Sequence, residues 1–366
     1  VMKFGGTSLG DINLIKSAAL KIQEEYNKGK YVIAIVSAMS GTTNKLVKLV
    51  SDVSKTFDVS EHDTVISSGE QISSGLLSIA LQEIGISAKS WAGWQVPILT
   101  DNNFGKASII DIKTLNIWND LDKGYVPVIS GFQGITNENR ITTLGRGGSD
   151  TSAVAIAAAF KAERCDIYTD VDGVYTTDPR IVPKATKLNF ITFEEMLELS
   201  SQGAKVLHTR SVLLAMNYNV KLQVLSSFKD SPGTMIVNED NKMEKSMISG
   251  IAYSSNEAKI TLYNVLDKPG QAANIFGALA DNTINVDMIV QTSTLDGSAT
   301  DITFTILESD LQRTKEIIQT LKDEIKFTEI LEDSKVTKVS VVGSGMRTKP
   351  GIAKTMFETL ANNNIN

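Results

Sequence analysis

The sequence TLGRGGSDTSAVAIAAAF, residues 143–160, joins a glycine-rich turn to an apolar run. Its alanine-rich second half predicts a helix over Asp150–Phe160. Before that helix stand Arg146 and two adjacent glycines. Glycine lets a backbone approach a ligand closely, and arginine offers a planar fork for a carboxylate or phosphate. Ser149 or Asp150 is expected to cap the helix. Capping does not explain the arginine and glycines, so the stretch predicts an anion site at a helix start.

Strand and helix patterns alternate through residues 1–235 on either side of this stretch. Residues 31–37, YVIAIVS, form a continuous apolar run that is typical of a strand buried on both faces. The alternation predicts an α/β fold with a largely parallel sheet sandwiched by helices, and ligands outside the carboxyl ends of its strands. The expected strands are Val1–Lys3, Tyr31–Ser37, Val126–Ser130, Cys165–Tyr168 and Val220–Leu225. The expected helices are Ile12–Tyr26, Val65–Ile84, Asp150–Phe160, Phe193–Leu199 and Lys205–Asn217.

Composition restricts the class of protein. A chain of 366 residues, 42% hydrophobic and 21% charged, predicts a soluble globular protein of two or three domains. The net charge of −6 argues against nucleic-acid and anionic-membrane partners, and no apolar run is long enough to span a bilayer. No signal peptide is recognisable, and because Val1 is not an initiator methionine we expect a few residues before it.

Cysteine and histidine are scarce. Cys165 is the single cysteine, which excludes a disulfide framework and a cysteine metal site and favours the reducing cytoplasm. His62 and His208 are the two histidines, too few for a His-rich metal site. A histidine-based triad is also disfavoured. We expect His208 to be a core or capping residue.

The C-terminal part contains an internal repeat. LDKPGQAANIFGALADNTIN (Leu266–Asn285) matches RTKPGIAKTMFETLANNNIN (Arg347–Asn366). Each copy follows a short strand, Lys259–Tyr263 and Lys338–Val342. Two copies of one supersecondary unit are therefore expected.

The first copy continues as a ferredoxin-like βαββαβ module. Its further elements are strands at Val286–Gln291 and Asp301–Leu307, a helix at Asp310–Lys322 and a strand near Phe327–Leu331. The second copy stops after one strand and one helix, so we expect more chain or another segment to complete its sheet. The polar run NEDNKMEKS reads as a linker. We therefore predict a catalytic domain over 1–235, a linker over 236–246, a first module over 247–332 and an incomplete second module over 333–366.

Three further stretches have the character of anion-binding helix starts. KFGGTS (Lys3–Ser8) and SAMSGTTN (Ser37–Asn44) are glycine-containing strand-to-helix turns. SSGE (Ser67–Glu70) puts a carboxylate early in a helix. Simpler interpretations remain open: an ordinary strand–turn–helix junction for the first, and complementation of the helix dipole for Glu70. Neither GxxxxGK[ST] nor GxGxxG is present.

Two later stretches complete the set. YTDVDGVYTTDPR (Tyr168–Arg180) is a strand running into a tight turn, with a plain β-hairpin as the simpler alternative. QGAKVLHTR (Gln202–Arg210) is expected to begin a helix that carries Lys205.

Taken in order with GFQG (Gly131–Gly134) and FEEMLELSSQGAKVLHTR (Phe193–Arg210), these motifs resemble those of the aspartokinases. The repeats resemble paired ACT domains. The resemblance covers essentially the whole chain and is closest to monofunctional enzymes without a homoserine dehydrogenase domain. It implies transfer of the ATP γ-phosphoryl group to the β-carboxylate of L-aspartate. The product, 4-phospho-L-aspartate, leads to lysine, with its precursor diaminopimelate, and to threonine and methionine. A carboxylate nucleophile is ionised at pH 7 and needs no general base, which suits a chain with few histidines.

The resemblance also assigns residues. The catalytic residues are Lys3, Arg146 and Asp150. The aspartate-binding residues are Thr43, Glu70, Arg146, Gly147, Gly148 and Ser149. The ATP-binding residues are Lys3, Phe4, Gly5, Gly6, Ser37, Thr169, Asp170, Tyr175, Arg180 and Lys205. In this scheme Lys3 stabilises the transferring phosphoryl group and Asp150 orients Lys3 or the substrate. Arg146 takes a carboxylate and Glu70 the ammonium group. Mg²⁺ is expected on the phosphates, held mainly by ATP rather than by a protein metal site.

The ACT modules are expected to bind a feedback amino acid, with lysine the first candidate and threonine the second. The expected effector residues are Asp267, Gly270, Gln271, Asn285, Val286, Asp287 and Gln291. A homodimer or higher oligomer through these modules is implied. The alternative is that the modules only dimerise the enzyme.

Two other functions remain open from the residues. One is another amino-acid kinase, acting on glutamate, acetylglutamate or carbamate, which the paired repeats disfavour. The other is a non-catalytic amino-acid-sensing subunit, which the presence of the kinase motifs disfavours. A nicotinamide dehydrogenase is disfavoured because no GxGxxG follows a strand.

Overall fold

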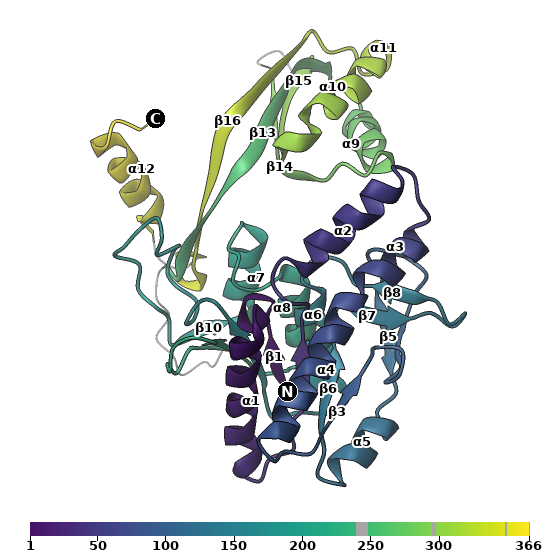
Figure 1. The fold of residues 1–366 in the computed structure, drawn as a ribbon. Helices are drawn as coiled ribbons and strands as arrows, with labels where there is room; N and C mark the ends of the chain where they lie inside the picture. The colour runs from purple at the N-terminus through teal and green to yellow at the C-terminus, as the bar shows by residue number, and fades with distance from the viewer. Residues whose placement is uncertain (239–247, 295–297, 348–349, 366) are drawn as a thin grey trace. The chain divides into compact units, whose positions relative to one another are not determined.

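The computed structural model describes residues 1–238, 248–294, 298–347 and 350–365. The chain forms two compact units. Unit 1 contains Val1–Ile251 and Val341–Asn366, and unit 2 contains Ala252–Ser340. The chain therefore leaves unit 1, builds unit 2 and returns to unit 1 (Figure 1).

Unit 1 is built on an eight-stranded sheet with strand order β10-β12-β11-β9-β1-β2-β6-β3. Every neighbouring pair is parallel except β11 with β12. The central strands are buried along their whole length, as expected for a sheet covered on both faces. The predicted parallel sheet is thus confirmed. The strands are β1 (Met2–Phe4), β2 (Ala34–Val36), β3 (Ala88–Trp91), β6 (Val126–Ser130), β9 (Cys165–Thr169), β10 (Phe190–Thr192), β11 (Leu222–Ser226) and β12 (Thr234–Val237).

Helices cover both faces of this sheet (Figure 1). On one face α1 and α4 insert apolar side chains such as Ile22 and Leu77 between themselves and the strands. On the other face α6 lies against β1, β2 and β9 and packs on α8. The helices of unit 1 are α1 (Ile12–Asn27), α2 (Thr42–Val53), α3 (Val59–Ile66), α4 (Ser68–Glu83), α5 (Leu115–Leu121), α6 (Gly148–Ala159), α7 (Phe193–Ser201), α8 (Thr209–Asn217) and α12 (Ile352–Asn362), with short 3₁₀ turns η1 (Thr7–Leu9) and η3 (Ser344–Arg347).

A second, four-stranded sheet that the sequence did not predict lies in unit 1, with order β5-β4-β7-β8. β7 follows β6 after two residues, and β8 runs into the turn before α6. The small sheet therefore frames the carboxyl edge of the main sheet. Its strands are too short to give a periodic pattern: β4 (Ile98–Thr100), β5 (Ile109–Ile112), β7 (Gln133–Ile135) and β8 (Ile141–Thr143).

Several predicted boundaries differ from the structure. The helix expected over Val65–Ile84 is divided at Ser67 into α3 and α4. The helix expected from Lys205 begins only at Thr209, because the His208 side chain accepts from the Arg210 N–H and caps it. After β9 the chain runs into turns, as expected, and the simpler alternative of a β-hairpin is wrong, since the described residues there form only an isolated bridge between Tyr175 and Lys187. Most of the predicted linker, 239–246, lies outside the described residues.

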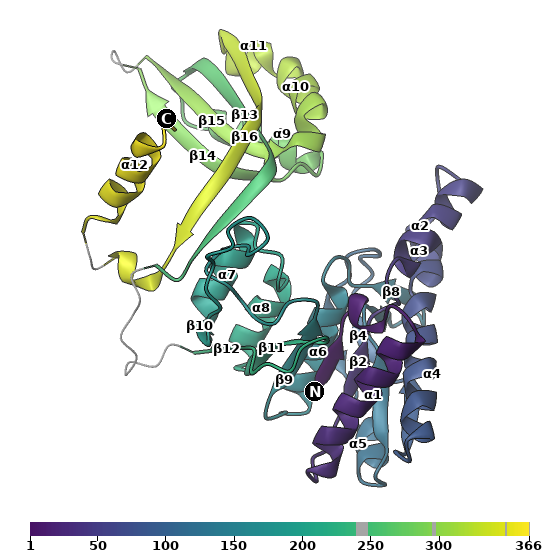
Figure 2. The same ribbon diagram turned by 60° about the vertical axis from the view of Figure 1, so that its left-hand side comes forward.

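Unit 2 is a four-stranded sheet of order β14-β15-β13-β16 with helices on one face (Figure 2). Its core holds Ile260, Ile275, Phe304 and Ile318 between sheet and helices. The element order βαββαβ confirms the predicted ferredoxin-like module. The elements are β13 (Gly250–Leu266), α9 (Gln271–Asp281), β14 (Val286–Ser293), β15 (Ala299–Leu307), η2 (Glu308–Asp310), α10 (Leu311–Thr320), α11 (Lys322–Ile325) and β16 (Glu329–Val342).

The repeat is visible in matching helix starts. The N-cap residue of α9 is Gly270 and that of α12 is Gly351. Both glycines have a left-handed backbone conformation, with φ of 97° and 104°. The strand expected to end the first copy and the strand expected to open the second are one continuous strand, β16. The predicted boundary between the modules, at 332/333, lies inside this strand. Along the described residues, no helix combines the length and apolar character needed to cross a membrane.

Candidate active site

The carboxyl ends of four neighbouring strands meet at one edge of the main sheet. Parallel registers align Phe4 of β1 with Val36 of β2 and Tyr168 of β9, and Val36 with Ser130 of β6. The loops that follow are held together by backbone hydrogen bonds, from Gly5 N to Tyr168 O at 3.1 Å and from Ser37 N to Phe4 O at 3.1 Å. The predicted motifs KFGGTS and SAMSGTTN are therefore neighbours at the edge where such sheets bind ligands.

Lys3 and Asp150 form a buried ion pair at this edge. Lys3 is the second residue of β1 and is 7% exposed, and Asp150 lies in the first turn of α6. The Lys3 Nζ and Asp150 Oδ1 atoms are 2.5 Å apart. The prediction that Ser149 or Asp150 caps α6 is wrong, because the N-cap is Gly147 and no side chain caps the helix. The Asp150 carboxylate pairs with the lysine instead.

Glycine N-caps open two helices at this edge. α2 begins at Gly41 and α6 at Gly147, both with φ above +60° and without a side-chain cap. Uncapped first-turn N–H groups favour anions. A Cβ on Gly6 would lie 2.9 Å from the Ala38 carbonyl oxygen, and one on Gly147 would lie 2.4 Å from the His208 side chain. Glycine is thus required by close approach between loops.

Glu70 supplies a buried carboxylate beside the β2–α2 loop. It lies in the first turn of α4 and is 3% exposed. Oε1 accepts from the Ala38 N–H at 3.0 Å, while the buried Oε2 has no hydrogen-bond partner within the described residues. Burial raises the pKa of Glu70 to about 7, against the opposing effect of the Ala38 hydrogen bond. A carboxylate in this state is suited to a cationic partner.

The other predicted aspartate-binding residues lie at the starts of α2 and α6. Thr43 is half-buried in the first turn of α2, and Ser149 is half-buried beside Gly131. Arg146 is exposed in the turn before α6, and its side chain has no hydrogen bond or ion pair among the described residues. The guanidinium is therefore available to a ligand.

The predicted nucleotide residues form two groups. Thr169 and Asp170 end β9, where Thr169 Oγ1 donates to Asp170 Oδ1 at 3.1 Å. Farther along the chain, Arg180 forms an ion pair with Asp178 at 2.7 Å. The hydrogen bond from Arg180 lowers the pKa of the Asp178 carboxyl group, and the charge of Lys205 acts in the same direction. The helix expected to carry Lys205 starts after it, so Lys205 lies in a loop.

Tyr175, the remaining predicted nucleotide residue, lies in the loop after β9. Its hydroxyl donates to Asp172 Oδ1 at 2.8 Å. Within the described residues no ion pair joins this part of the site to Lys3 and Asp150. The structure thus brings Lys3, Asp150 and the glycine turns together.

Sequence reasoning missed several side chains that support the site. Asp63, from α3, is fully buried and accepts from the N–H and the hydroxyl of Thr143. Arg210 donates to the Leu144 carbonyl at 2.7 Å. No pattern in the chain marks these residues, because their partners are backbone atoms distant in sequence. His208 does cap α8, as one of its two expected roles.

Comparisons with known proteins give the family. The amino acid kinase family model matches residues 1–226, and ACT domain models match residues 260–326 and 339–366. The aspartate kinase of Pseudomonas putida is 48% identical over all of this chain and 89% of that protein.

The chain belongs to the aspartokinase family.

Solved aspartokinase structures have the same fold. Escherichia coli aspartokinase III in complex with aspartate and ADP, in the R-state, aligns with a TM-score of 0.82 at 27% identity over 98% of this chain and 90% of that one. The T-state structure of that enzyme with lysine and aspartate aligns with a TM-score of 0.76 at 26% identity and the same coverage. This aspartokinase accordingly phosphorylates L-aspartate with ATP and carries ACT domains for allosteric feedback by amino acids.

The predicted effector residues of this aspartokinase lie in unit 2. Asp267 and Gly270 are exposed at the start of α9, and Asn285, Val286 and Gln291 lie before or along the edge strand β14. The Gln271 Oε1 atom, in the first turn of α9, is buried without a partner among the described residues.

Asp287, another predicted effector residue, is engaged within unit 2. Its carboxylate forms an ion pair with Lys338 of β16. Lys338 Nζ also lies 4.0 Å from Glu257 Oε1 of β13.

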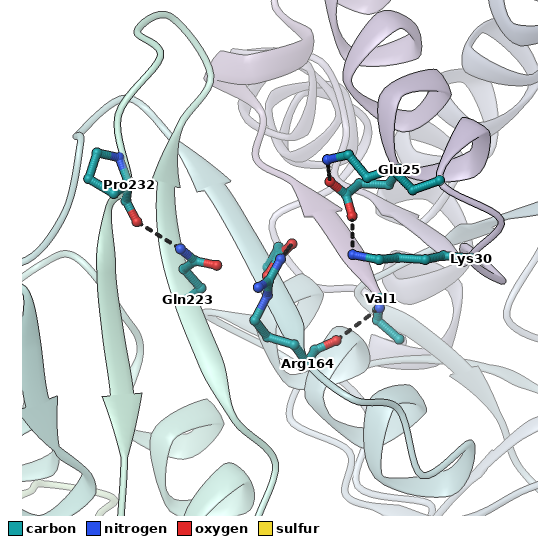
Figure 3. A network of polar contacts seen from close by, with 8 residues as sticks. Val1, Glu25, Lys30, Arg164, Gln223 and Pro232 are labelled. Atoms are coloured by element: carbon teal, nitrogen blue, oxygen red, sulfur yellow. Dashed lines mark hydrogen bonds and ion pairs between the residues drawn. The ribbon is translucent and has the colours of Figure 1, made fainter.

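A cavity of about 350 Å³ lies at the opposite, amino edge of the main sheet, where Val1, Glu25, Lys30 and Arg164 take part in a network of polar contacts (Figure 3). Arg164 pairs there with Asp166 and accepts at its carbonyl from the Val1 amino group at 3.0 Å. Glu25 accepts from Lys30 at 2.7 Å, and the hydrogen bonds from Lys28 and Lys30 lower the pKa of Glu25 to about 2. These ion pairs lie at the edge away from the glycine turns, so we do not assign catalysis to this cavity.

Proposed function

We propose that phosphoryl transfer takes place at the Lys3–Asp150 pair and that aspartate binds beside it. The observation that carries the proposal is the unpartnered Oε2 of Glu70, a buried carboxylate oxygen without a hydrogen bond in the described part of the chain. Leaving such an atom unpaired is costly, and a substrate ammonium group satisfies it. Arg146 then takes the carboxylate of aspartate that does not react, because a planar guanidinium matches a carboxylate with two hydrogen bonds. Thr43 and residues 147–149 complete this half of the site.

The proposed reaction needs no proton transfer. An oxygen of the aspartate β-carboxylate forms a bond to the γ-phosphorus, the bond from that phosphorus to the bridging oxygen breaks, and ADP leaves. Charge develops on the phosphoryl oxygens, and the Lys3 ammonium stabilises it. Asp150 holds the lysine in place through their ion pair. The nucleophile is already ionised at pH 7.

We propose that Gly5, Gly6 and Ser37 approach the phosphates of ATP, with Phe4 at the end of the same strand. The glycine turns at the strand ends suit this role, since backbone N–H groups and a buried cation favour phosphate. The remaining ATP-binding residues are proposed to be Thr169, Asp170, Tyr175, Arg180 and Lys205. Mg²⁺ is proposed to arrive with ATP and to neutralise phosphate charge, because Mg²⁺ usually keeps few protein ligands. Along the described residues, no group of three His, Cys, Asp or Glu side chains is placed to hold a metal ion.

The first test separates kcat from substrate binding. In Lys3→Met, kcat is expected to fall by roughly 10²–10³, the usual loss for one transition-state contact, while the KM for ATP changes little. Aspartyl phosphate trapped as its hydroxamate measures the rate. A variant with near-normal kcat would remove Lys3 from the mechanism.

The second test assigns Arg146. Arg146→Lys is expected to raise the KM for aspartate by at least about tenfold and leave the KM for ATP nearly unchanged, since an ammonium replaces a bidentate fork poorly. Arg140→Lys is the matched control, because Arg140 pairs with Glu61 on an exposed surface. Equal effects on both substrates would mean that Arg146 serves phosphate.

We also propose lysine as the feedback effector, with threonine the second candidate. Support comes from the lysine in the T-state neighbour and from the helix start and strand edge of unit 2. We likewise propose a homodimer or higher oligomer that forms through the ACT modules. Domain boundaries at residues 235, 246 and 332 are proposed as well. The single cysteine supports the proposal of a cytoplasmic location.

A further inference from the structure

The residues just before the turn that carries Arg146 form hydrogen bonds with the side chains of Asp63 and Arg210. Asp63 Oδ2 accepts from the Thr143 N–H at 2.8 Å, and Asp63 Oδ1 accepts from the Thr143 hydroxyl at 2.8 Å. One residue later, Arg210 Nη1 donates to the Leu144 carbonyl at 2.7 Å. Two successive residues at the end of β8 are therefore held by an anion on one side and a cation on the other.

The same two side chains also hold a second loop. Asp63 Oδ2 accepts from the Gly105 N–H at 2.8 Å, and Arg210 Nη2 donates to the Ala107 carbonyl at 2.7 Å. The two loops are joined directly by the bond from Ala107 N to Thr143 O at 2.9 Å. Asp63 and Arg210 thus brace residues 105–107 against residues 143–144. We call these two side chains the brace.

The brace matters because it holds one end of the turn that carries Arg146. Arg146 stands between Gly145 and Gly147, which are both left-handed, with φ of 74° and 66°. Glycine has the widest backbone freedom of any residue, so a Gly-Arg-Gly turn keeps one shape only if both of its ends are fixed. α6 fixes the far end. The near end is fixed at Thr143 and Leu144, by the brace together with the backbone hydrogen bond from Leu144 N to Phe132 O at 2.9 Å.

We propose that Asp63 and Arg210 are positioning residues for aspartate recognition, acting through the backbone of residues 143–145 on Arg146. This inference rests on the proposed role of Arg146. Asp63 is fully buried and Arg210 is half-buried, and each accepts or donates to two segments at once. Neither is assigned to contact the substrate.

The test is a change in the KM for aspartate that depends on Arg146. Arg210→Lys keeps the charge but cannot reach both carbonyls, and misplacement of a binding group by about 1 Å can lower rate by about 10²-fold. We expect kcat/KM for aspartate to fall roughly 10–100-fold, mainly through KM, with the KM for ATP within about twofold of wild type. Thr143→Val, which removes only the hydroxyl bond to Asp63, is expected to act in the same direction with a smaller effect.

The matched control is Arg164→Lys. Arg164 is likewise part-buried and makes two hydrogen bonds to Asp166, but at the opposite edge of the sheet (Figure 3). It is expected to alter thermal stability without changing the KM for aspartate. If Arg210→Lys fails to fold by circular dichroism, Thr143→Val carries the test.

A double-mutant cycle with Arg146→Ala completes the experiment. In that background the effect of Arg210→Lys, or of Thr143→Val, is expected to shrink to about twofold or less, because the group it positions is gone. The same fold-change in both backgrounds, or an equal rise in the KM for ATP, would overturn the inference alone. An unchanged KM for aspartate in Arg146→Ala itself would overturn the proposed role of Arg146 and the inference with it.

Discussion

Glu70 links the chemistry of the site to pH. Its pKa of about 7 means that much of the free enzyme holds a proton there at neutral pH, although the proposed ammonium site needs the carboxylate. We expect the KM for aspartate to fall as pH rises through about 7 and then to level off. Glu70→Gln should raise this KM and remove its dependence on pH in this range. The measurement is a set of aspartate titrations between pH 6 and 8.5, and an unaltered pH slope in the variant would exclude Glu70.

Ionisation of Glu70 with rising pH favours aspartate binding but lowers the stability of the fold. Because the folded pKa lies above the ordinary value of 4.5, Glu70 supports the fold fully only below pH 4.5, and this contribution is lost as pH rises through about 7. At pH 8.5 Glu70→Gln should therefore raise the free energy of unfolding, by up to about 3 kcal/mol at 1.36 kcal/mol per pKa unit. Near pH 4.5 the two proteins should unfold alike. Denaturant unfolding at both pH values gives the comparison.

At the residue scale, the structure bears on one pair of the predicted site residues, and the roles of all of them remain predictions. The motifs marked Lys3, Asp150 and Glu70 as site residues, and the structure puts the first two in contact. The family resemblance anticipated that Asp150 orients Lys3 or the substrate, whereas the capping preference of Ser and Asp wrongly predicted a cap, because Gly147 starts α6 without a side-chain cap. Arg210 carried no signal, since its partners are carbonyl groups in other segments.

Among the elements, the turn before α6 requires glycine at Gly147. Gly147→Ala adds a Cβ that would lie 2.4 Å from the His208 side chain, at a φ of 66°. Gly29→Ala is the control, with a φ of 77° and open space around its Cβ. Gly29→Ala should cost about 1–2 kcal/mol for the left-handed backbone alone. Gly147→Ala should cost roughly 1–3 kcal/mol more, from overpacking.

Denaturant unfolding and aspartate titration of both variants check this comparison. Gly147→Ala should also raise the KM for aspartate, whereas Gly29→Ala should leave it unchanged. Equal stability losses would show that the contact between Gly147 and His208 relaxes without cost.

Element prediction worked for long patterns and failed for short ones. The amphipathic pattern over Ile12–Tyr26 and the apolar helix after Asp150 were located within a few residues. The four strands of the small sheet were not predicted, because three or four residues cannot display a period. The late start of α8 depends on a capping side chain, His208, that the helical pattern does not reveal.

At the scale of the whole molecule, the proposed effector site predicts separable regulation. Asp267→Ala or Gln291→Ala should weaken lysine inhibition and leave kcat without effector nearly unchanged, because an effector acts only through its different affinity for two states. The expected shift in the inhibitory lysine concentration is roughly 5–150-fold. Gln312→Ala, an exposed glutamine on α10, is the matched control.

Lysine titrations of aspartyl phosphate formation measure this shift. If the variants are inhibited by lysine as strongly as wild type, the effector site does not include Asp267 or Gln291. A variant that also loses kcat without lysine would indicate a structural rather than a regulatory role.

The path of the chain between the two units has a consequence for modular architecture. The main chain of Ser249, just before the departure into unit 2, donates to the carbonyl of Val342, just after the return, at 2.8 Å. The points at which the chain leaves unit 1 and returns to it are thus joined by a hydrogen bond. Unit 2 therefore has the connectivity of an inserted cassette. A short tight turn in place of residues 252–340 would close the kinase without stretching its backbone.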